Sequence, residues 1–300
     1  MNKIIITGKS GFVGTNLSNH LTDNSYIVDC ISLRNLNLKI KFEADTIIHL
    51  AGKAHDTKNV SDSSEYFKVN SDLTKNLFDF FLDSGAKDFI YFSSVKAAAD
   101  NVVDVLNEEI KPNPKTPYGE SKLKAEEYIL SKDIPQSKRV FIIRPCMIHG
   151  PGNKGNLNLL YNLVNKRIPY PLSSFDNERS FLGIDNLNYL IMGIIRDKDI
   201  PSGIYNFADD EFVSTNELVK IISSVSGKRN ISIAIPQIVI NKLAKIGDLI
   251  KFPLNSETVQ KLTENYRVSN QKIKIAIGIE KLPFTAKQGL EKTIKSFISK

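Results

Sequence analysis

A tyrosine and a lysine four residues apart, Tyr118 and Lys122, are the residues whose types and spacing most directly suggest chemistry. Four residues make about one helical turn, so both side chains would lie on one face of a helix. A phenol is a poor acid or base near neutral pH, because its reference pKa is about 10. An ammonium group one turn away favours the phenolate and is expected to lower the pKa of Tyr118. The pair is therefore predicted to act as a general acid or base.

A serine accompanies this pair at the end of an apolar segment. Phe89–Phe92 has the composition of a buried strand, and Ser93 and Ser94 follow it directly. Ligands of open α/β sheets bind beside the carboxyl ends of the strands. We therefore expect the Ser94 hydroxyl to hydrogen-bond the substrate oxygen at a carbon that gains or loses hydride.

Hydride chemistry requires a cofactor, and the first fourteen residues predict a site for one. Ile4, Ile5 and Ile6 indicate a short strand buried on both faces, and the glycines then fall as Gly8-x-x-Gly11-x-x-Gly14. The first glycine permits a tight turn, the second lets the backbone approach a pyrophosphate, and the third lets the helix lie close to the strand. A helix beginning at Phe12 would then point its free N–H groups at the phosphates.

The elements that must position these residues alternate between strand and helix. Strands are expected near residues 4–6, 26–31, 45–50, 89–92 and 140–143, and helices near 12–21, 62–84 and 117–132. This alternation predicts an α/β fold, a Rossmann-type doubly wound parallel sheet. After Gly150 helical patterns dominate, near 156–166, 185–195, 217–225 and 237–250, with a short strand near 204–207. Residues 1–150 are thus expected to bind the dinucleotide, and 151–300 to form a smaller, mostly helical substrate lobe.

Composition narrows the class of protein. The net charge of +7 comes from basic residues scattered among 33 acidic ones, which indicates a solvated surface and no nucleic-acid partner. The two cysteines, Cys30 and Cys146, provide no disulfide framework, and no histidine cluster has metal-ligand spacing, so no metal is expected. No apolar run reaches the roughly 18 residues of a membrane span. Because the chain opens directly into a strand, we expect no signal peptide and a cytoplasmic location.

Together these motifs resemble the extended short-chain dehydrogenase/reductases, the nucleotide-sugar epimerase/dehydratase superfamily. The resemblance is carried by Gly8-x-x-Gly11-Phe-Val-Gly14, Ala51-Gly52, Ser94, Tyr118-x-x-x-Lys122, Arg144-Pro145, Gly150-Pro-Gly152 and the segment Asn177-Glu-Arg179-Ser-Phe-Leu-Gly-Ile-Asp185. It implies that Tyr118 is the acid or base, that Lys122 holds the nicotinamide ribose and tunes Tyr118, and that Ser94 orients the sugar oxygen. It also implies a homodimer formed through the helices near 62–84 and 117–132.

The resemblance implies two sets of binding residues. The cofactor would contact Gly8, Ser10, Gly11, Phe12, Val13, Gly14, Ser32, Arg34, Leu50, Ala51, Gly52, Tyr118, Lys122 and Pro145. The substrate would contact Ser94, Lys96, Tyr118, Asn156 and Arg179, the last two through its diphosphate.

Two departures from the family pattern restrict the activity. Family members that eliminate water from the sugar have acidic residues just after the catalytic Ser or Thr, whereas Val95 and Lys96 follow Ser94, so 4,6-dehydratase activity is not expected. NAD users place an acidic residue at the end of the second strand, where our alignment puts Ser32, with Arg34 nearby, which favours NADP. If the strand register were three residues different, Asp29 would occupy that position and favour NAD.

The segments Ser93–Lys96 and Gly150–Asn156 most resemble enzymes acting on UDP-linked N-acetylated 6-deoxyhexoses in surface polysaccharide synthesis. The first hypothesis is therefore a 4-ketoreductase acting on a UDP-4-keto-6-deoxy-N-acetylhexosamine. A UDP-hexose 4-epimerase with tightly held NAD would use the same residues and remains open. A non-catalytic NADP-sensing regulator is a third reading, which the presence of Ser94, Tyr118 and Lys122 opposes, because a sensor needs no proton donor.

Overall fold

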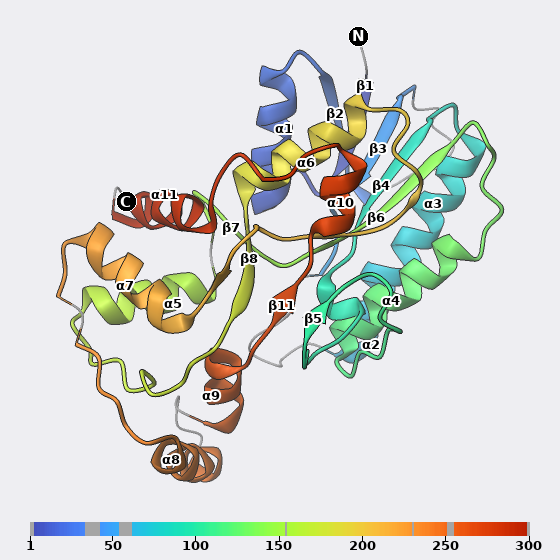
Figure 1. The fold of residues 1–300 in the computed structure, drawn as a ribbon. Coiled ribbons are helices and arrows are strands. Elements are labelled where there is room, and N and C mark those ends of the chain that lie inside the picture. The colour runs from blue at the N-terminus through green and yellow to red at the C-terminus, as the bar shows by residue number, and fades with distance from the viewer. Residues whose placement is uncertain are drawn as a thin grey trace.

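The computed structural model of the protein describes residues 3–33, 43–53, 62–153, 155–229, 231–250 and 255–298. Arg34 and His55 lie outside these residues, as does the side chain of Asn156. Six parallel strands form the central sheet (Figure 1). They are β1 (Lys3–Thr7), β2 (Ile27–Ile31), β3 (Thr46–His49), β4 (Asp88–Phe92), β6 (Arg139–Pro145) and β9 (Gly203–Phe207).

The order of the strands creates a crevice at the end of β1. The sheet runs β2-β1-β3-β4-β6-β9, so the chain leaves β1 toward one side and returns to its other side. Ligands of doubly wound sheets bind at the carboxyl ends of the strands where this order reverses. The turn that follows Thr7 therefore lies at the ligand-binding position of the fold, and the predicted fold class is confirmed.

Helices cover both faces of the sheet. On one face lie α1 (Phe12–Asp23) and α6 (Ile184–Arg196), and on the other α3 (Leu73–Asp83) and α4 (Pro117–Leu130). Ile4 and Ile6 belong to the core on the α1 side, and Ile5 belongs to the core on the α3 side. Because both faces are covered, this strand has no polar alternation.

The helix expected over residues 62–84 is interrupted. It is built from α2 (Ser63–Tyr66), a six-residue π-helical segment η2 (Phe67–Asp72) and α3. The π segment shifts the phase of the buried face, so Asn70 and Thr74 point inward, whereas the apolar Val69 and Leu73 are only half-buried. Such π segments occur often at functional sites.

Part of the chain after residue 150 returns to the first domain. β9 completes the central sheet, and α6 shares a hydrophobic core with β1 and α1. The remaining elements include the helices α5 (Asn156–Asn165), α7 (Thr215–Ser226), α8 (Gln237–Ile250), α9 (Ser256–Thr263), α10 (Gln271–Ala276) and α11 (Ala286–Ile298). They also include the short strands β5 (Val105–Leu106), β7 (Met147–His149), β8 (Arg179–Gly183), β10 (Phe212–Val213) and β11 (Arg267–Val268). Within the described ranges, no helix is long and apolar enough to span a bilayer.

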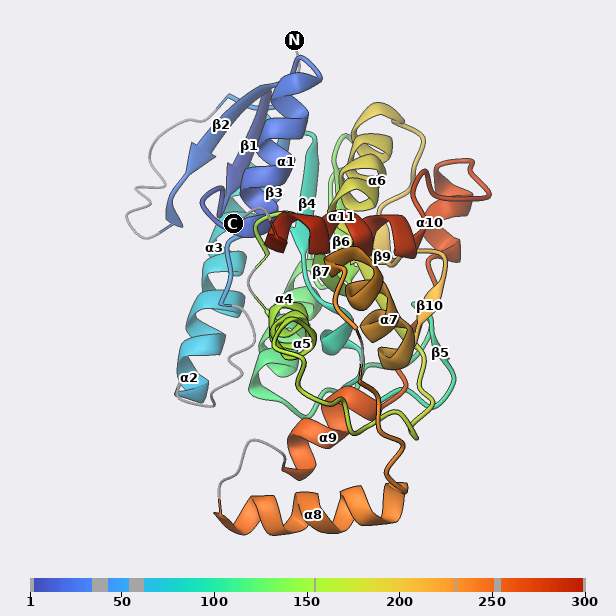
Figure 2. The same cartoon turned by 90° about the vertical axis from the view of Figure 1, so that its left-hand side faces the viewer.

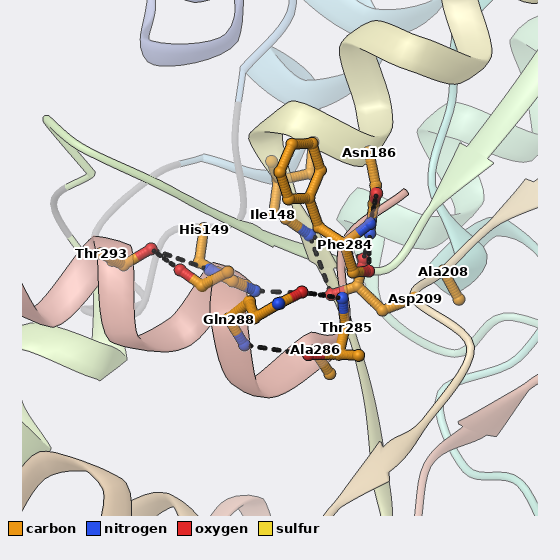
Figure 3. A network of polar contacts seen from close by, with 12 residues as sticks. Ile148, His149, Asn186, Ala208, Asp209, Phe284, Thr285, Ala286, Gln288 and Thr293 are labelled. Atoms are coloured by element: carbon orange, nitrogen blue, oxygen red, sulfur yellow. Dashed lines mark hydrogen bonds and ion pairs between the residues drawn. The ribbon is translucent and has the colours of Figure 1, made fainter. Parts of the chain in front are cut away.

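A buried polar network ties α11 to the rest of the molecule (Figure 3). The Asp209 carboxylate accepts the Gly183 N–H at 3.0 Å and the Asn186 side-chain amide at 2.7 Å. His149 lies beside it, with Nε2 3.6 Å from Asp209 Oδ2, and its Nδ1 is 2.9 Å from the Thr293 hydroxyl of α11. His149 is thus buried between Asp209 and α11.

Candidate active site

The glycine turn after β1 has the geometry that a diphosphate requires. Gly8 has a φ of +75°, which favours glycine, and its carbonyl accepts the Gly11 N–H at 3.0 Å. A Cβ on Gly14 would lie 2.3 Å from the Gly8 oxygen, so only glycine lets α1 approach this closely. No side chain caps α1, and its first turn has no acidic residue. The N–H groups at this helix terminus therefore suit an anion, and the turn fits a dinucleotide.

The crevice wall beside this turn is held by a relay of hydrogen bonds through His49. The Thr7 hydroxyl is 2.7 Å from His49 Nδ1, and His49 Nε2 is 2.9 Å from the Thr74 hydroxyl, which donates to the Asn70 carbonyl. Burial, together with the nearby Lys122 charge, lowers the pKa of His49 to about 3. Neutral His49 thus joins β1, β3 and α3.

The same relay places several predicted cofactor residues. Ala51 donates its N–H to the Thr7 hydroxyl at 3.1 Å, and Leu50 donates its N–H to the Thr7 carbonyl at 3.2 Å. Ser10 lies in the glycine turn and is exposed, and Pro145 ends β6 at the same edge of the sheet. Phe12 and Val13, two further residues of the predicted set, lie in the first turn of α1.

Ser94 and Tyr118 are brought together by the start of α4. Thr116 caps this helix by accepting the Gly119 N–H at 3.3 Å. A Cβ on Gly119 would lie 2.4 Å from the Lys96 carbonyl, so glycine allows α4 to pack directly on the turn after Ser94. In this arrangement Ser94 and Tyr118 share a side-chain hydrogen bond. The two residues come from segments that the sequence could place on the same side of the sheet but could not place in contact.

The pKa of Tyr118 shifts in the direction opposite to the sequence prediction. Burial raises it above the usual value, more than the Ser94 hydrogen bond lowers it, and the neighbouring Tyr66 also raises it. The ring of Tyr66 packs edge-on against Tyr118, with 6.2 Å between the ring centroids. The Tyr118 side chain is therefore a neutral phenol near neutral pH, a proton donor.

Lys122 lies deeper, on the same helical face. Its Nζ donates to the Phe92 carbonyl at 2.8 Å, and a Cβ on Gly52 would lie 3.2 Å from that nitrogen. Burial lowers the pKa of Lys122 to about 8, and Glu126 opposes this shift. Lys122 thus stands between α4, β4 and the predicted cofactor segment Ala51-Gly52.

A buried ion pair fixes α4 against the central sheet. Glu126, one turn after Lys122, pairs with Arg144 at the carboxyl end of β6, with 3.0 Å from Arg144 Nε to Glu126 Oε1. Ser93 donates its hydroxyl to the same carboxylate. Because all three side chains are buried, α4 is fixed against both β4 and β6.

Asn70 is a site residue that the sequence reasoning missed. Its Oδ1 accepts the Lys53 N–H at 2.7 Å, while its Nδ2 donates to the Lys53 carbonyl at 3.1 Å and to the Ser121 hydroxyl at 3.0 Å. It therefore links the segment after Gly52 to α4. The available signal was a polar residue four positions after Tyr66, on the buried face of a helix.

The end of β2 distinguishes the two registers considered for the cofactor ribose. Ile31 pairs with Thr7, so Ser32 follows β2 at the level of Gly8. Asp29 lies within the strand, where its carboxylate is 2.9 Å from Lys3 Nζ. Ser32 is thus the first residue after β2, and Asp29 lies two residues before the end of the strand.

Lys96 and Arg179, the predicted substrate cations, meet around Tyr266. The Nζ of Lys96 lies 4.1 Å from the Tyr266 ring centroid and donates to the Asp100 carbonyl at 2.7 Å. The backbones of Arg179 and Tyr266 form an isolated parallel β-bridge, and the Arg179 Nη2 is 3.9 Å from Glu264 Oε1. Burial lowers the pKa of Arg179, with Glu264 opposing it. Two cations beside the turn after Ser94 form a site suited to an anionic group.

Comparison with known proteins connects this geometry to established activities. The profile of a family described as the NAD dependent epimerase/dehydratase family matches residues 4–208. A UDP-glucose 4-epimerase of Vibrio cholerae is 31% identical, covering 98% of this chain and 95% of its own. An N-acetyl-alpha-D-glucosaminyl-diphospho-ditrans,octacis-undecaprenol 4-epimerase of Escherichia coli O157:H7 is 25% identical, covering 97% and 94%.

A reductase also matches. A UDP-2-acetamido-2,6-beta-L-arabino-hexul-4-ose reductase of Pseudomonas aeruginosa is 30% identical over 65% of this chain and 50% of its own. Among solved structures, that of MoeE5 in complex with UDP-glucose and NAD has a TM-score of 0.78 at 19% identity, covering 99% of both chains. At that identity the structural match establishes the shared fold.

Proposed function

The chain belongs to the NAD-dependent epimerase/dehydratase family, and from this premise we propose that it is an NADPH-dependent 4-ketoreductase of a UDP-4-keto-6-deoxy-N-acetylhexosamine. In this reaction the C4 carbonyl is reduced by hydride, and a side chain must supply the proton that completes the alcohol. Tyr118 is a neutral phenol beside Ser94, as protonation of a new alkoxide requires. The expected setting is the synthesis of surface polysaccharide.

The observation that carries the choice of a reductase is Ser32 at the end of β2. A carboxylate there would hydrogen-bond the ribose diol of NAD and repel the 2′-phosphate of NADP. Ser32 is exposed and carries no negative charge, so it would not repel the 2′-phosphate of NADP and would leave room for it. A cofactor that must be exchanged after every turnover fits a reductase better than an epimerase, which regenerates its own cofactor.

The residues of the chain divide the work as follows. Ser94 orients the C4 carbonyl oxygen, and Tyr118 delivers a proton to it as the carbonyl becomes an alcohol. Lys122 holds the nicotinamide ribose and adds positive charge beside the phenol. The glycine turn and the start of α1 hold the diphosphate of the cofactor. When bound, the reduced nicotinamide supplies the hydride.

The direct test is to follow NADPH absorbance with purified protein and the UDP-4-keto-6-deoxy sugar. Consumption of NADPH and appearance of the 4-hydroxy product would support the proposal. No consumption with either NADPH or NADH would refute it, and binding of NADPH without consumption would instead favour the regulator.

A 4-epimerase is the second candidate, because the Vibrio cholerae relative that matches nearly the whole chain is one. The same Ser94, Tyr118 and Lys122 would serve, with NAD retained through oxidation and re-reduction. Protein that purifies with bound NAD and interconverts UDP-hexoses without added cofactor would decide for this reaction. Mass spectrometry of the cofactor released on denaturation separates the two candidates.

The substrates named for the two matched 4-epimerases have a diphosphate in common. One relative acts on a UDP-sugar, and the other on a sugar joined through a diphosphate to undecaprenol. We propose that Lys96 and Arg179, beside Tyr266, bind this diphosphate, with Asn156 at the start of α5 as a further contact. UDP is the carrier in our proposal.

A further inference from the structure

One helix of the C-terminal lobe has an uncovered apolar face. α8 lies at one end of the molecule, with α9 beside it (Figure 2). It is firmly attached, because Ile240 and Ala244 are buried in the C-terminal core. In addition, Asp248 accepts the N–H of Ser256 at 2.9 Å and its hydroxyl at 2.6 Å. The helix is thus a fixed part of the lobe.

The sides of α8 turned away from the core are rich in large aliphatic residues. Val239, Leu243 and Ile246 follow one another at helical spacing, and all three are exposed. On the neighbouring stripe Ile238 and Leu249 are 72% and 85% exposed. Scattered exposed aliphatics need no explanation, but five on one side of a 14-residue helix form a continuous surface.

Two lysines complete this surface. Lys242 and Lys245 are exposed and lie on the same stripe as Ile238 and Leu249, one turn apart along the helix. The polar residues of the helix, Gln237, Asn241 and Asp248, lie together on a different side. Lys242 and Lys245 thus lie among the exposed aliphatic residues, and helices that present both lysines and large aliphatic residues to the outside can lie in the plane of a membrane interface.

We propose that α8 docks onto a membrane surface that contains anionic lipids, with its axis in the membrane plane. Because α8 lies at one end of the molecule, its exposed side can approach a flat membrane surface (Figure 2). Aliphatic stems let Lys242 and Lys245 reach headgroup phosphates while Ile238, Ile246 and Leu249 enter the acyl boundary. The net charge of +7 attracts the whole protein to such a surface.

A second copy of the chain fits this surface less well. In a two-fold pair the same surface meets itself, so the contact would take Lys242 and Lys245 of both copies into an apolar interface. Buried like charges of this kind are costly. Anionic headgroups instead complement both lysines. The proposal places the substrate lobe at the membrane and does not rest on which reaction the enzyme performs.

Sedimentation with vesicles tests the proposal. The wild-type protein should pellet with vesicles of phosphatidylglycerol and phosphatidylcholine, and less with phosphatidylcholine alone or at high salt. The double variant I238E/L249E should bind at least about tenfold more weakly. The matched control V103E/I275E changes two other exposed aliphatics by the same charge and should bind as the wild type does.

A fluorescent probe gives an independent readout, because the chain has no tryptophan. The variant Ile246→Trp should show a blue-shifted emission when phosphatidylglycerol vesicles are added, and Ile275→Trp on α10 should not. NADPH oxidation with the soluble UDP-4-keto sugar should be the same in I238E/L249E and the wild type. That comparison separates failure of docking from failure of the proposed reaction.

Three results would overturn the proposal. They are no pelleting of the wild type with phosphatidylglycerol vesicles, equal pelleting of wild type and I238E/L249E, and a wild-type oligomer that I238E/L249E dissociates while neither protein binds vesicles. The last result would make the α8 surface an interface between copies of this chain.

Discussion

At the scale of single residues, the protonation of Tyr118 decides what the site can do. Burial raises its pKa, while the Lys122 ammonium has a pKa of about 8. Near neutral pH both groups therefore hold their protons, and the phenol can donate. As the pH rises through about 8, Lys122 loses its charge, whereas Tyr118 keeps its proton.

Replacing Tyr118 with Phe removes the hydroxyl and keeps the ring that packs on Tyr66. We expect turnover to fall by about 10² to 10⁴, because a positioned general acid is lost. Cofactor affinity, measured by titrating NADPH fluorescence, should change little. Turnover that stays at the wild-type rate would mean that another group donates the proton.

Replacing Ser32 with Asp should exchange the cofactor preference. The new carboxylate would lie at the level of Gly8, where it can accept hydrogen bonds from a ribose diol and repel a 2′-phosphate. We expect the KM for NADPH to rise at least about tenfold and that for NADH to fall. Steady-state kinetics with both cofactors checks this, and an unchanged ratio would show that Ser32 does not face the ribose.

At the scale of elements, the approach of α4 to the turn after Ser94 depends on a missing side chain. In Gly119→Ala the new Cβ would lie 2.4 Å from the Lys96 carbonyl, so the start of α4 must move and carry Tyr118 with it. Displacements of about 1 Å at a reacting group can cost 10²-fold in rate, so kcat should fall by at least about tenfold. Gly85→Ala is the control, since its Cβ meets no atom within 4 Å.

The relay through His49 predicts acid sensitivity of the fold. Its pKa is about 3 in the folded protein and 6.5 in the unfolded chain, so the unfolded state binds more protons between these values. Stability is therefore lost as the pH falls below 6.5, by about 2 kcal/mol at pH 5 from this group. Urea unfolding at pH 7.5 and pH 5 should show a smaller loss in His49→Gln; an equal loss in both proteins would exclude His49 as the cause.

At the scale of the whole molecule, the C-terminal helix is tied to the sheet by buried polar contacts (Figure 3). Thr293→Val removes the partner of His149 Nδ1 and should lower the free energy of unfolding by about 1 to 3 kcal/mol. Lys292→Ala changes an exposed residue of the same helix and breaks its ion pair with Asp185 of α6, which should cost less than about 1 kcal/mol. Thermal or urea unfolding compares the two, and equal costs would contradict a special role for the buried contact.

The sequence by itself determined the parts of this protein that depend on a few neighbouring residues. An uninterrupted β-branched run indicated the Ile4–Ile6 strand, and the glycine spacing indicated the turn after it. The helical period of 3.6 residues put Tyr118 and Lys122 on one face of a helix. For that reason the sheet and most helices could be predicted, and Tyr118 and Lys122 could be placed on one helix as candidates. The interruption at Phe67–Asp72 could not be predicted, because the apolar residues on both sides of it still recur at helical spacing in the sequence.

Only the tertiary structure decided the properties set by residues distant in sequence. The direction of the Tyr118 pKa shift depends on burial, which outweighs the hydrogen bond from Ser94, and the position of Asn70 depends on Lys53 and Ser121. The return of β9 to the sheet likewise joins two halves of the chain. Burial and hydrogen bonding are sums over everything that packs around a group, whereas periodicity reports only which way its own backbone turns.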